Sequence, residues 1–530
     1  MFLMYKPQKN QFDFELKNDT SEKQNADTDK KVSSDIDENK QYINQLYNTD
    51  INNDIVIRDI VTYIGSHKIR ALIYSADGIA SEKKITENIL EPLMLFADAD
   101  IDRQISAEFI AERLITQVQL EISDKIYDAA QKINIGNAII FFDGIDRVII
   151  ADVKNWEHRN IGEPLSEQVI QGPHEAFNEV LRCNTALIRT TLNNSNLIAQ
   201  NVSLGKTSKT PGALMYLGNV ANKNLVNEVM RRIQNIDCEY ILSTLDVEQY
   251  IEEASFLPIP QIVTTERPDR VCKSLVEGRV ALFLNGSSHA LIMPATLFDL
   301  ASSVEDDYLR YPYSILIRIV RFLAMAIATL APAFFVAATQ YHQDLILNDL
   351  FLSIQASRLS VPFSIVFELL IMEISFELIR EAGVRVPGHI GSTLGIVGGL
   401  ILGTAAVDAN IVSPVMIIVV AITGISSFAI PSYSLSFSLR FSRFLYIFGA
   451  ALCGFVGLFA VFFANTVMYM GTKSFGVPFM SPLAPTDNSG HSGVLFRKPL
   501  WKQDKRPEYL KPKDKSDKAH ISRKWLGGNK

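Results

Sequence analysis

The sequence predicts an α/β soluble domain of two similar subdomains, followed by an all-α transmembrane helical bundle. Charged residues make up 21% of the 530 residues and hydrophobic residues 48%, yet the mean hydropathy is +0.12. Nearly all of this apolar surplus lies between Ile315 and Met470, in runs long enough to cross a bilayer. The chain before Ile315 alternates instead between strand-like and helix-like patterns, which is typical of an α/β fold.

The first segment, residues 1–53, consists mainly of Asn, Asp, Lys, Gln and Ser. Such a composition buries too little apolar surface to offset the entropy lost on ordering. We therefore expect a disordered polar arm that the fold does not need, with a functional tether as the alternative. No secretory signal opens the chain, so we expect the soluble part to stay on the side of the membrane where it is made.

The first α/β subdomain is expected over residues 54–200. Ile69–Tyr74 has the composition of a strand, and Ile79–Leu95 has the pattern of a helix. Phe109–Ile126 predicts a second amphipathic helix. Ala138–Phe142 and Val148–Val153 predict a hairpin around Asp143 and Gly144, because Gly beside Asp is a hairpin signal.

A second subdomain is expected over residues 201–312, because the pattern recurs 142 residues further along the chain. Leu72–Tyr74 matches Leu214–Tyr216, and Gly136–Gly144 matches Gly278–Gly286 at the same offset. Two anchors at one offset indicate an internal duplication. The alternative is that two strand–turn–strand units converged on the same turn chemistry.

The helical domain is expected over residues 313–485, with four to six membrane helices. The apolar runs are Phe322–Ala338, Val361–Ile379, Ile390–Val407, Ile411–Ile430 and Phe444–Met470. The second run carries Glu368, Glu373 and Glu377, which would be costly against lipid and should therefore face the bundle interior, water or an interface. Alternatively, Glu377 pairs locally with Arg380 at the level of the headgroups.

The last segment, residues 486–530, forms a basic tail. From Arg497 to Lys530 the chain contains twelve Lys and Arg residues and only four Asp and Glu residues. By the positive-inside rule the tail lies on the same side as the soluble domain, which requires an even number of crossings. Arg440 and Arg443, at the start of the last apolar run, give the opposite signal, and we give more weight to the larger tail.

No catalytic or metal-binding arrangement is visible, so we expect no enzyme, no cofactor and no metal site. The four cysteines show no CxxC spacing, which indicates free thiols in a reducing compartment. Gly205-Lys206-Thr207 resembles the end of a phosphate-binding loop, but Gln200 stands where the loop needs glycine. Nucleic acid is not expected as a partner.

Glycines occur at every fourth position of one predicted membrane helix: Gly391, Gly395, Gly399 and Gly403. Such a stripe lets a neighbouring backbone approach closely, either between subunits or inside one bundle. On the remaining faces, large apolar residues could form a constriction, and Asp408 could concentrate cations at the pore mouth. The apolar gate candidates are Leu394, Val397, Ile401 and Leu402.

A dense charged cluster, Glu266, Arg267, Pro268, Asp269 and Arg270, lies near the end of the second subdomain. Pro268 suits a first helical turn and Asp269 complements the helix dipole, so the cluster has the pattern of a capped helix start. We also expect it to fix the second subdomain against a neighbour, within or between chains.

Thr265–Val271, followed by Leu275–Val280, resembles the hallmark of the A subunits of GerA-type spore germinant receptors. The other blocks that resemble this family are Gln171–Phe177, Asn184–Arg189, Phe428–Ser434 and Ser474–Phe479. His174 and Ala176 stand where the family usually has Arg and Gly. The likeness runs from about Asp54 to Pro485, and the A-type subunit of the stage V sporulation A operon shares the same blocks.

The resemblance implies a multi-pass protein in the inner membrane of the bacterial endospore, in contact with membrane lipids, with its soluble domain facing the core. It implies a transporter-like B subunit and a lipoprotein C subunit as partners. It further implies a homo-oligomer that forms a ligand-gated ion channel, releasing monovalent cations when germination begins. Two alternatives are a non-conducting scaffold that assembles the B and C subunits, and a secondary transporter, which the lack of a visible inverted repeat disfavours.

Overall fold

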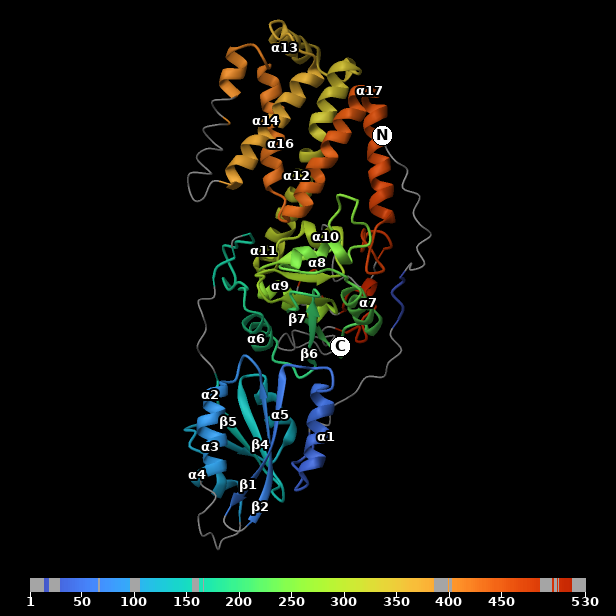
Figure 1. The fold of residues 1–530 in the computed structure, drawn as a ribbon. Coiled ribbons are helices and arrows are strands. Elements are labelled where there is room, and N and C mark those ends of the chain that lie inside the picture. Colours follow the sequence, from blue (N-terminus) through green and yellow to red (C-terminus); the bar gives the residue numbers. More distant parts are fainter. Residues whose placement is uncertain are drawn as a thin grey trace, which may run out of the picture.

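The computed structural model describes residues 14–18, 29–64, 67–95, 105–154, 162–164, 166–385, 399, 403–486, 498–499, 503 and 505–516. Figure 1 shows three stacked parts: a first α/β subdomain at one end, a second α/β subdomain in the middle, and a helical bundle at the other end. The fold class expected from the sequence is therefore confirmed.

The first subdomain is a five-stranded antiparallel sheet in the order β1-β2-β4-β5-β3. Helices cover both faces, since α1 and α5 share one apolar core with the sheet, while α3 and α4 share the other. The strands are β1 Ile55–Ile64, β2 His67–Ala76, β3 Leu120–Ser123, β4 Asn137–Phe142 and β5 Val148–Asp152. The helices are α1 Ile36–Tyr47, α2 Glu82–Ile85, a π-helical turn Thr86–Leu90, α3 Glu91–Leu95, α4 Ala107–Arg113 and α5 Ile126–Ile133.

The second subdomain repeats this plan, with the strand order β6-β7-β9-β10-β8. One face of its sheet packs on α6 and α9, and the other packs on α7 and α8. The strands are β6 Leu197–Leu204, β7 Thr210–Leu217, β8 Val263–Thr265, β9 Val280–Leu284 and β10 Ala290–Met293. The helices are α6 Leu181–Thr191, α7 Lys223–Gln234, α8 Thr244–Ile251, α9 Pro268–Glu277, α10 Leu297–Ala301 and α11 Glu305–Tyr308.

The two sheets agree in register as well as in strand order. Ile140 pairs with Ile149 in the first sheet, and Leu282, 142 residues after Ile140, pairs with Leu291 in the second. Glu121 and Val263 occupy matching positions on the edge strands β3 and β8 in the same way. The prediction of two similar subdomains is confirmed.

The predicted disordered arm is wrong for residues 29–53. Asp35 caps α1 through a hydrogen bond from the Asp37 amide, and Ile43 and Tyr47 are fully buried against the first sheet. The average composition of the segment is polar, but its few apolar residues recur at helical spacing and form one continuous stripe. The rest of the arm, apart from residues 14–18, lies outside the described residues.

Two further boundaries differ from the prediction. The expected helix Phe109–Ile126 is instead the short helix α4, the edge strand β3 and the start of α5, because β3 has only four residues, too few for the alternation of Leu120 to Ser123 to stand out from a helical pattern. The predicted boundary at 200/201 cuts through β6, which belongs with α6 to the second subdomain. The strand Ile69–Tyr74, the helical run up to Leu95 and the hairpin are confirmed.

The bundle consists of long helices that extend away from the second subdomain (Figure 1). They are α12 Tyr311–Gln340, α13 Asn348–Arg358, α14 Ile365–Arg385, α16 Pro414–Phe428 and α17 Tyr433–Gly471. Among the described helices, α12 and α17 are long and apolar enough to cross a membrane by length and composition, and α16 is a shorter apolar helix. The predicted span Ile390–Val407 lies mostly outside the described residues.

Helix α17 is a hairpin of two helical arms rather than one straight span. Its backbone leaves the helical region at Cys453 and at Gly454, where φ is +60° and ψ is −138°. The Asn465 amide donates to the Tyr446 hydroxyl at 3.0 Å, whereas residues 19 apart in a straight helix are separated by about 28 Å. The predicted single span Phe444–Met470 is therefore wrong, since Gly454 allows a reversal that apolar composition does not reveal.

The chain returns to the second subdomain after the bundle. Phe475 and Val477, in the small hairpin β11 (Lys473–Ser474) and β12 (Val477–Pro478), pack into its core, and Leu510 is fully buried there. The Lys513 amide donates to the Val220 carbonyl at 2.9 Å. Residues 505–516 of the predicted basic tail therefore form a strap on the second subdomain. The bundle begins and ends at the same subdomain.

Candidate functional site

The charged cluster predicted from the sequence is centred on Arg267, the residue before the first turn of α9. Arg267 is fully buried, and its guanidinium donates four hydrogen bonds. Two go to Asp269, at 3.0 and 2.6 Å, and the others go to the carbonyls of Glu167 at 3.2 Å and Pro173 at 2.9 Å. Burial alone would lower the pKa of Arg267, but the hydrogen bonds and attraction of Asp269 raise it, so the group stays charged.

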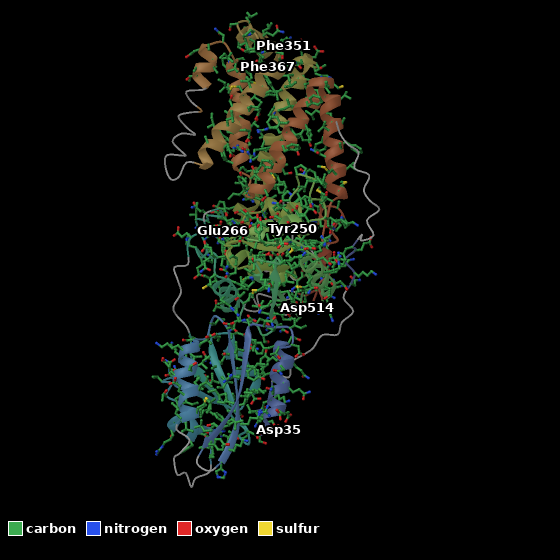
Figure 2. The ribbon with its side chains drawn as sticks, in the orientation of Figure 1. Asp35, Tyr250, Glu266, Phe351, Phe367 and Asp514 are labelled. Carbon is green, nitrogen blue, oxygen red and sulfur yellow. The ribbon has the colours of Figure 1, made fainter. Side chains whose placement is uncertain are left out.

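The neighbours of Arg267 strengthen the same contact. Arg270 forms an ion pair with Glu167 and donates to the Asp299 carbonyl at 2.8 Å. The Glu266 carbonyl accepts from the Phe177 amide at 2.8 Å, and its carboxylate lies 3.0 Å from His289. Figure 2 labels Glu266 on the second subdomain. The cluster therefore fastens the linker between the subdomains, residues 166–180, to the start of α9.

This geometry joins two sequence blocks that lie about a hundred residues apart. Gln171–Phe177 and Thr265–Val271 are separate blocks in the sequence, and the structure places them in direct contact through Arg267 and Glu266. Pro268 occupies the first turn of α9, as its pattern predicted. The cluster thus lies between the linker and the second subdomain, and its role against a neighbour, within or between chains, stays a prediction.

The block Asn184–Arg189 contributes to the joint between the two subdomains. Arg189 is fully buried and bonds Asp54 at 2.8 Å, the Asn134 side chain at 3.3 Å and the Leu197 carbonyl at 3.1 Å. Sequence reasoning did not select Arg189 or Asp54 as a site, because the partners are 135 residues apart and no local pattern connects them.

Two of the three bundle carboxylates are fully buried inside the bundle, and the third, Glu377, is 25% exposed. Glu368 is fully buried and accepts from the Ser413 amide at 2.7 Å, with Arg358 at 3.2 Å. Glu373 is fully buried beside Arg443 at 3.1 Å. Glu377 meets Arg440 at 2.5 Å and Arg443 at 2.9 Å. Burying these charges is tolerable only because each is paired.

Arg440 and Arg443 therefore have a different meaning from the one suggested by the sequence. They neutralise carboxylates of α14 from the first arm of α17, so they do not report which side of a membrane the helix end faces. Arg380 stacks against the rings of Phe376 and Phe428 and donates to Ser427.

The glycine stripe and the gate candidates fall mostly outside the described residues: Gly391, Gly395, Leu394, Val397, Ile401 and Leu402. Among the residues that the structure describes, a Cβ at Gly399 would meet no atom within 4 Å, and one at Gly403 would meet Ile417 at 3.8 Å. Asp408 is exposed just before Asn410, whose φ of +55° ends the helix. In the described part of the chain no group of three or more His, Cys, Asp or Glu could hold a metal ion.

Comparison with known proteins gives consistent relatives. The profile of the Bacillus/Clostridium GerA spore germination protein family matches residues 41–509. Spore germination protein KA of Bacillus subtilis (strain 168) is 40% identical over 87% of this chain and 84% of its own. An uncharacterised membrane protein of the same strain, YfkQ, is 36% identical over 90% of this chain and 92% of its own.

One solved structure is also similar, the N-terminal domain of the A subunit of the Bacillus megaterium spore germinant receptor GerK3. Its sequence is 29% identical, its TM-score is 0.40, and the match covers 51% of this chain and 99% of that one.

Proposed function

Because the chain belongs to the Bacillus/Clostridium GerA spore germination protein family, we propose that it is the A subunit of a nutrient germinant receptor. In this proposal it lies in the inner membrane of the spore as a homo-oligomer and forms a gated path for monovalent cations. A transporter-like B subunit and a lipoprotein C subunit complete the receptor, and the soluble domain faces the core.

The observation that carries the membrane assignment is the inverted surface of the bundle. Large apolar side chains point outward, for example Leu323 (59% exposed), Ile425 (71%) and Val456 (72%). Ionisable groups point inward, since Glu368, Glu373 and Arg443 are fully buried. In a membrane, charged groups face protein or a cavity, and apolar side chains face the hydrocarbon. In water, an apolar exterior of this extent is rare.

The return of the chain to the second subdomain supports an even number of crossings. The segment before α12 packs on this subdomain through Leu300 and Ala301, and the strap 505–516 packs on it through Leu510 and Arg506, which favours a position of both on one side of the membrane. The positive charge of the tail favours the side where the protein is made, which would be the core.

The open surface at Gly399 supports assembly through the glycine stripe. Among the described residues no atom lies within 4 Å of a Cβ built there, and a glycine lets a helix from a second subunit approach closely. In this arrangement Leu394, Val397, Ile401 and Leu402 form the apolar constriction, and Asp408 lies at its mouth.

Potassium flux from liposomes that contain the purified chain tests the proposal. Ile401→Ala or Leu402→Ser should make the liposomes leaky without nutrient, and Asp408→Asn should slow cation release, because a mouth carboxylate concentrates cations. Gly399→Leu should abolish oligomers in mild detergent. Gly471→Leu is the control, since a Cβ at this glycine also meets none of the described residues within 4 Å but the glycine lies off the stripe.

A wild-type chain that assembles with its B and C subunits but never conducts would overturn the channel. It would instead favour a scaffold that assembles the receptor. Unchanged ion release in all the variants, at normal protein abundance, would show that this helix is not the gate.

A further inference from the structure

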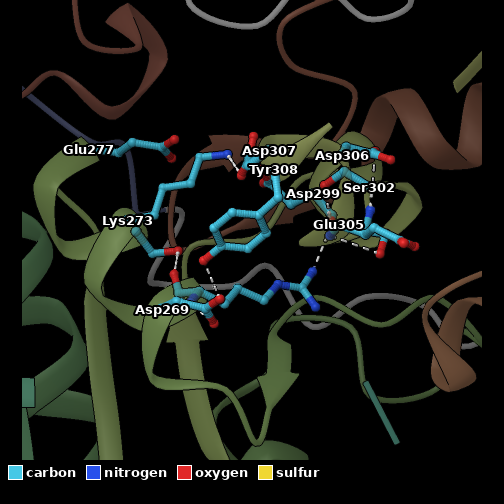
Figure 3. A network of polar contacts seen from close by, with 12 residues as sticks. Asp269, Lys273, Glu277, Asp299, Ser302, Glu305, Asp306, Asp307 and Tyr308 are labelled. Carbon is cyan, nitrogen blue, oxygen red and sulfur yellow. Dashed lines mark hydrogen bonds and ion pairs between the residues drawn. The ribbon is translucent and has the colours of Figure 1, made fainter. Parts of the chain in front are cut away.

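Helix α11 lies between the charged cluster of the second subdomain and the first helix of the bundle. Its four residues are Glu305, Asp306, Asp307 and Tyr308. Figure 3 shows them together with the facing residues of α9, among them Asp269 and Lys273. Asp306 contacts α12, whereas Asp307 and Tyr308 contact α9. Helix α11 therefore connects α9 directly to α12.

The contacts toward α9 come from Asp307 and Tyr308. Lys273 forms an ion pair with Asp307 at 2.5 Å, and the Tyr308 hydroxyl donates to Asp269 at 2.5 Å. Asp269 and Lys273 are four residues apart and therefore lie on one face of α9. Burial and the hydrogen bond to Asp269 raise the pKa of Tyr308, so its hydroxyl keeps the proton that it donates.

The linker between the subdomains also packs closely against Tyr308. A Cβ at Gly172 would come within 2.8 Å of the Tyr308 ring. Since Asp269 also binds Arg267, and Arg267 binds the linker carbonyls of Glu167 and Pro173, a displacement of the linker would reach Tyr308 by two routes.

The contacts toward the bundle come from Asp306. Its carboxylate is 1% exposed and accepts two hydrogen bonds from Arg321, at 2.7 and 3.0 Å, with Arg318 at 3.4 Å. The Ser314 hydroxyl also donates to the Asp306 carbonyl at 2.9 Å. A bidentate contact between two buried charges fixes direction as well as distance. Asp306 therefore sets the position of the first three turns of α12.

A cavity of about 380 Å³ lies beside this connection. Its lining includes Lys273, Asp307 and Tyr308 from the α9–α11 contact, together with Arg506 of the strap and Gln503 just before it. Close-packed elements cannot shift without free volume, and this cavity provides it on the side of α11 that faces the strap.

We propose that α11 is the connector that transmits movement of the linker and α9 to the first membrane helix, with Asp306 as the positioning residue for α12. The consequence for gating rests on the channel proposed above. The mechanical claim does not, because it concerns only α9, α11 and α12. Consecutive residues of one short helix hold the two elements, so α9 cannot move without moving or breaking α11.

The test uses the full-length chain in nanodiscs and measures amide hydrogen exchange over residues 311–321. The double variant Asp307→Asn, Tyr308→Phe removes the α9 contacts and leaves Asp306 intact. Exchange in these turns should rise by about tenfold, since local opening is governed by the contacts that oppose it. Glu305→Gln is the matched control, because it removes a charge from the same helix and should change exchange by less than about twofold.

A second measurement separates transmission from simple stabilisation. When Asp306→Asn is combined with the α9-side variants, the nutrient response of spores should fall no further than with either change alone. Each change by itself already interrupts the connection between α9 and α12, so the two effects should not add. Effects that multiply would overturn the connector. If Asp306→Asn does not accumulate, the exchange result of the α9-side variants decides alone, and unchanged exchange there overturns the proposal.

The two proposals can fail separately. If the wild-type chain conducts no ions but exchange at residues 311–321 responds as expected, the channel is wrong and the connector stands. If the chain conducts and the α9-side variants alter neither exchange nor the nutrient response, the connector is wrong and the channel stands.

Discussion

The two subdomains share a fold but differ at the position just before their matching helices, α5 and α9. In the first subdomain this position is Lys125, whose side chain is 47% exposed and lies 3.7 Å from Asp29. In the second subdomain it is Arg267, 142 residues later, which is fully buried and bonded to the linker. The same scaffold thus carries a solvated cation in one repeat and a structural junction in the other.

A second matched pair differs in its contacts, although both of its members are buried. Asn137 begins β4, and Arg279, at the corresponding position before β9, is buried and bonds Asp299 at 2.7 and 2.8 Å and the Pro294 carbonyl at 2.7 Å. Arg279 also donates to the hydroxyl of Tyr509, which belongs to the strap. The comparison teaches that the duplicated fold is a support, and that specialised contacts were added to the repeat nearest the bundle.

The largest expected effect is the loss of Arg267. Arg267→Ala leaves Asp269 and the linker carbonyls without their buried partner, and removing one member of a buried pair costs about 3–5 kcal/mol. Thermal unfolding of the full-length chain in detergent, together with hydrogen exchange over residues 166–180, would measure it. Lys125→Ala should cost no more than about 0.5 kcal/mol. Equal costs at the two positions would contradict the comparison.

The next effect concerns α1, the counterpart of α6. Ile43→Ala removes a fully buried side chain from the core that α1 shares with the first sheet. The cavity should cost about 2–4 kcal/mol of unfolding free energy. Ile51→Ala is the matched control, because that isoleucine is 44% exposed in the same segment. A cost below about 0.5 kcal/mol for Ile43→Ala would indicate that α1 does not contribute to the fold.

The sequence predicted features that depend on local pattern or on repetition. The paired anchors at Leu72 and Leu214 revealed the duplication because strands and tight turns constrain neighbouring residues. The long apolar run of α12 needed only composition. Pro268 and Asp269 correctly marked the start of α9 because helix starts are locally encoded.

Features set by contacts between distant residues could not be predicted in this way. Arg189 and Asp54, or Arg443 and Glu373, meet only after folding. The reversal at Gly454 leaves both arms of α17 apolar, so hydropathy sees one span. The average composition of residues 1–53 is polar, so it did not indicate the apolar stripe of α1. The positive charge of the tail did not indicate the strap, because the packing of the strap depends on the single buried side chain of Leu510.

The smallest predicted effect contrasts two carboxylates on α4 and α8, the helices that precede the matching edge strands β3 and β8. Burial, with a smaller contribution from Glu252, raises the pKa of Glu248 on α8 to about 7. The Thr264 hydroxyl donates to Glu248 at 3.3 Å, and this hydrogen bond opposes part of the rise. Hydrogen bonds from its own backbone and from Ser106 lower the pKa of Glu108 on α4. The two groups should therefore couple to pH with opposite sign.

Because the folded chain holds the Glu248 proton more tightly than the unfolded chain, this group stabilises the fold fully below about pH 4.5. That contribution is lost as the pH rises through about 7. Glu248→Gln keeps a neutral side chain at every pH. At pH 8 it should therefore be more stable than the wild type by about 1–2 kcal/mol and unfold at a higher temperature. Near pH 5 the stabilities of the two proteins should match. Thermal unfolding of the full-length chain between pH 5 and 8 measures the difference. Glu108→Gln should give no gain at pH 8, because its carboxylate is already favoured in the folded state. If both variants show the same pH dependence, the environment of α8 does not differ from that of α4, and the specialisation of the second subdomain does not extend to this helix.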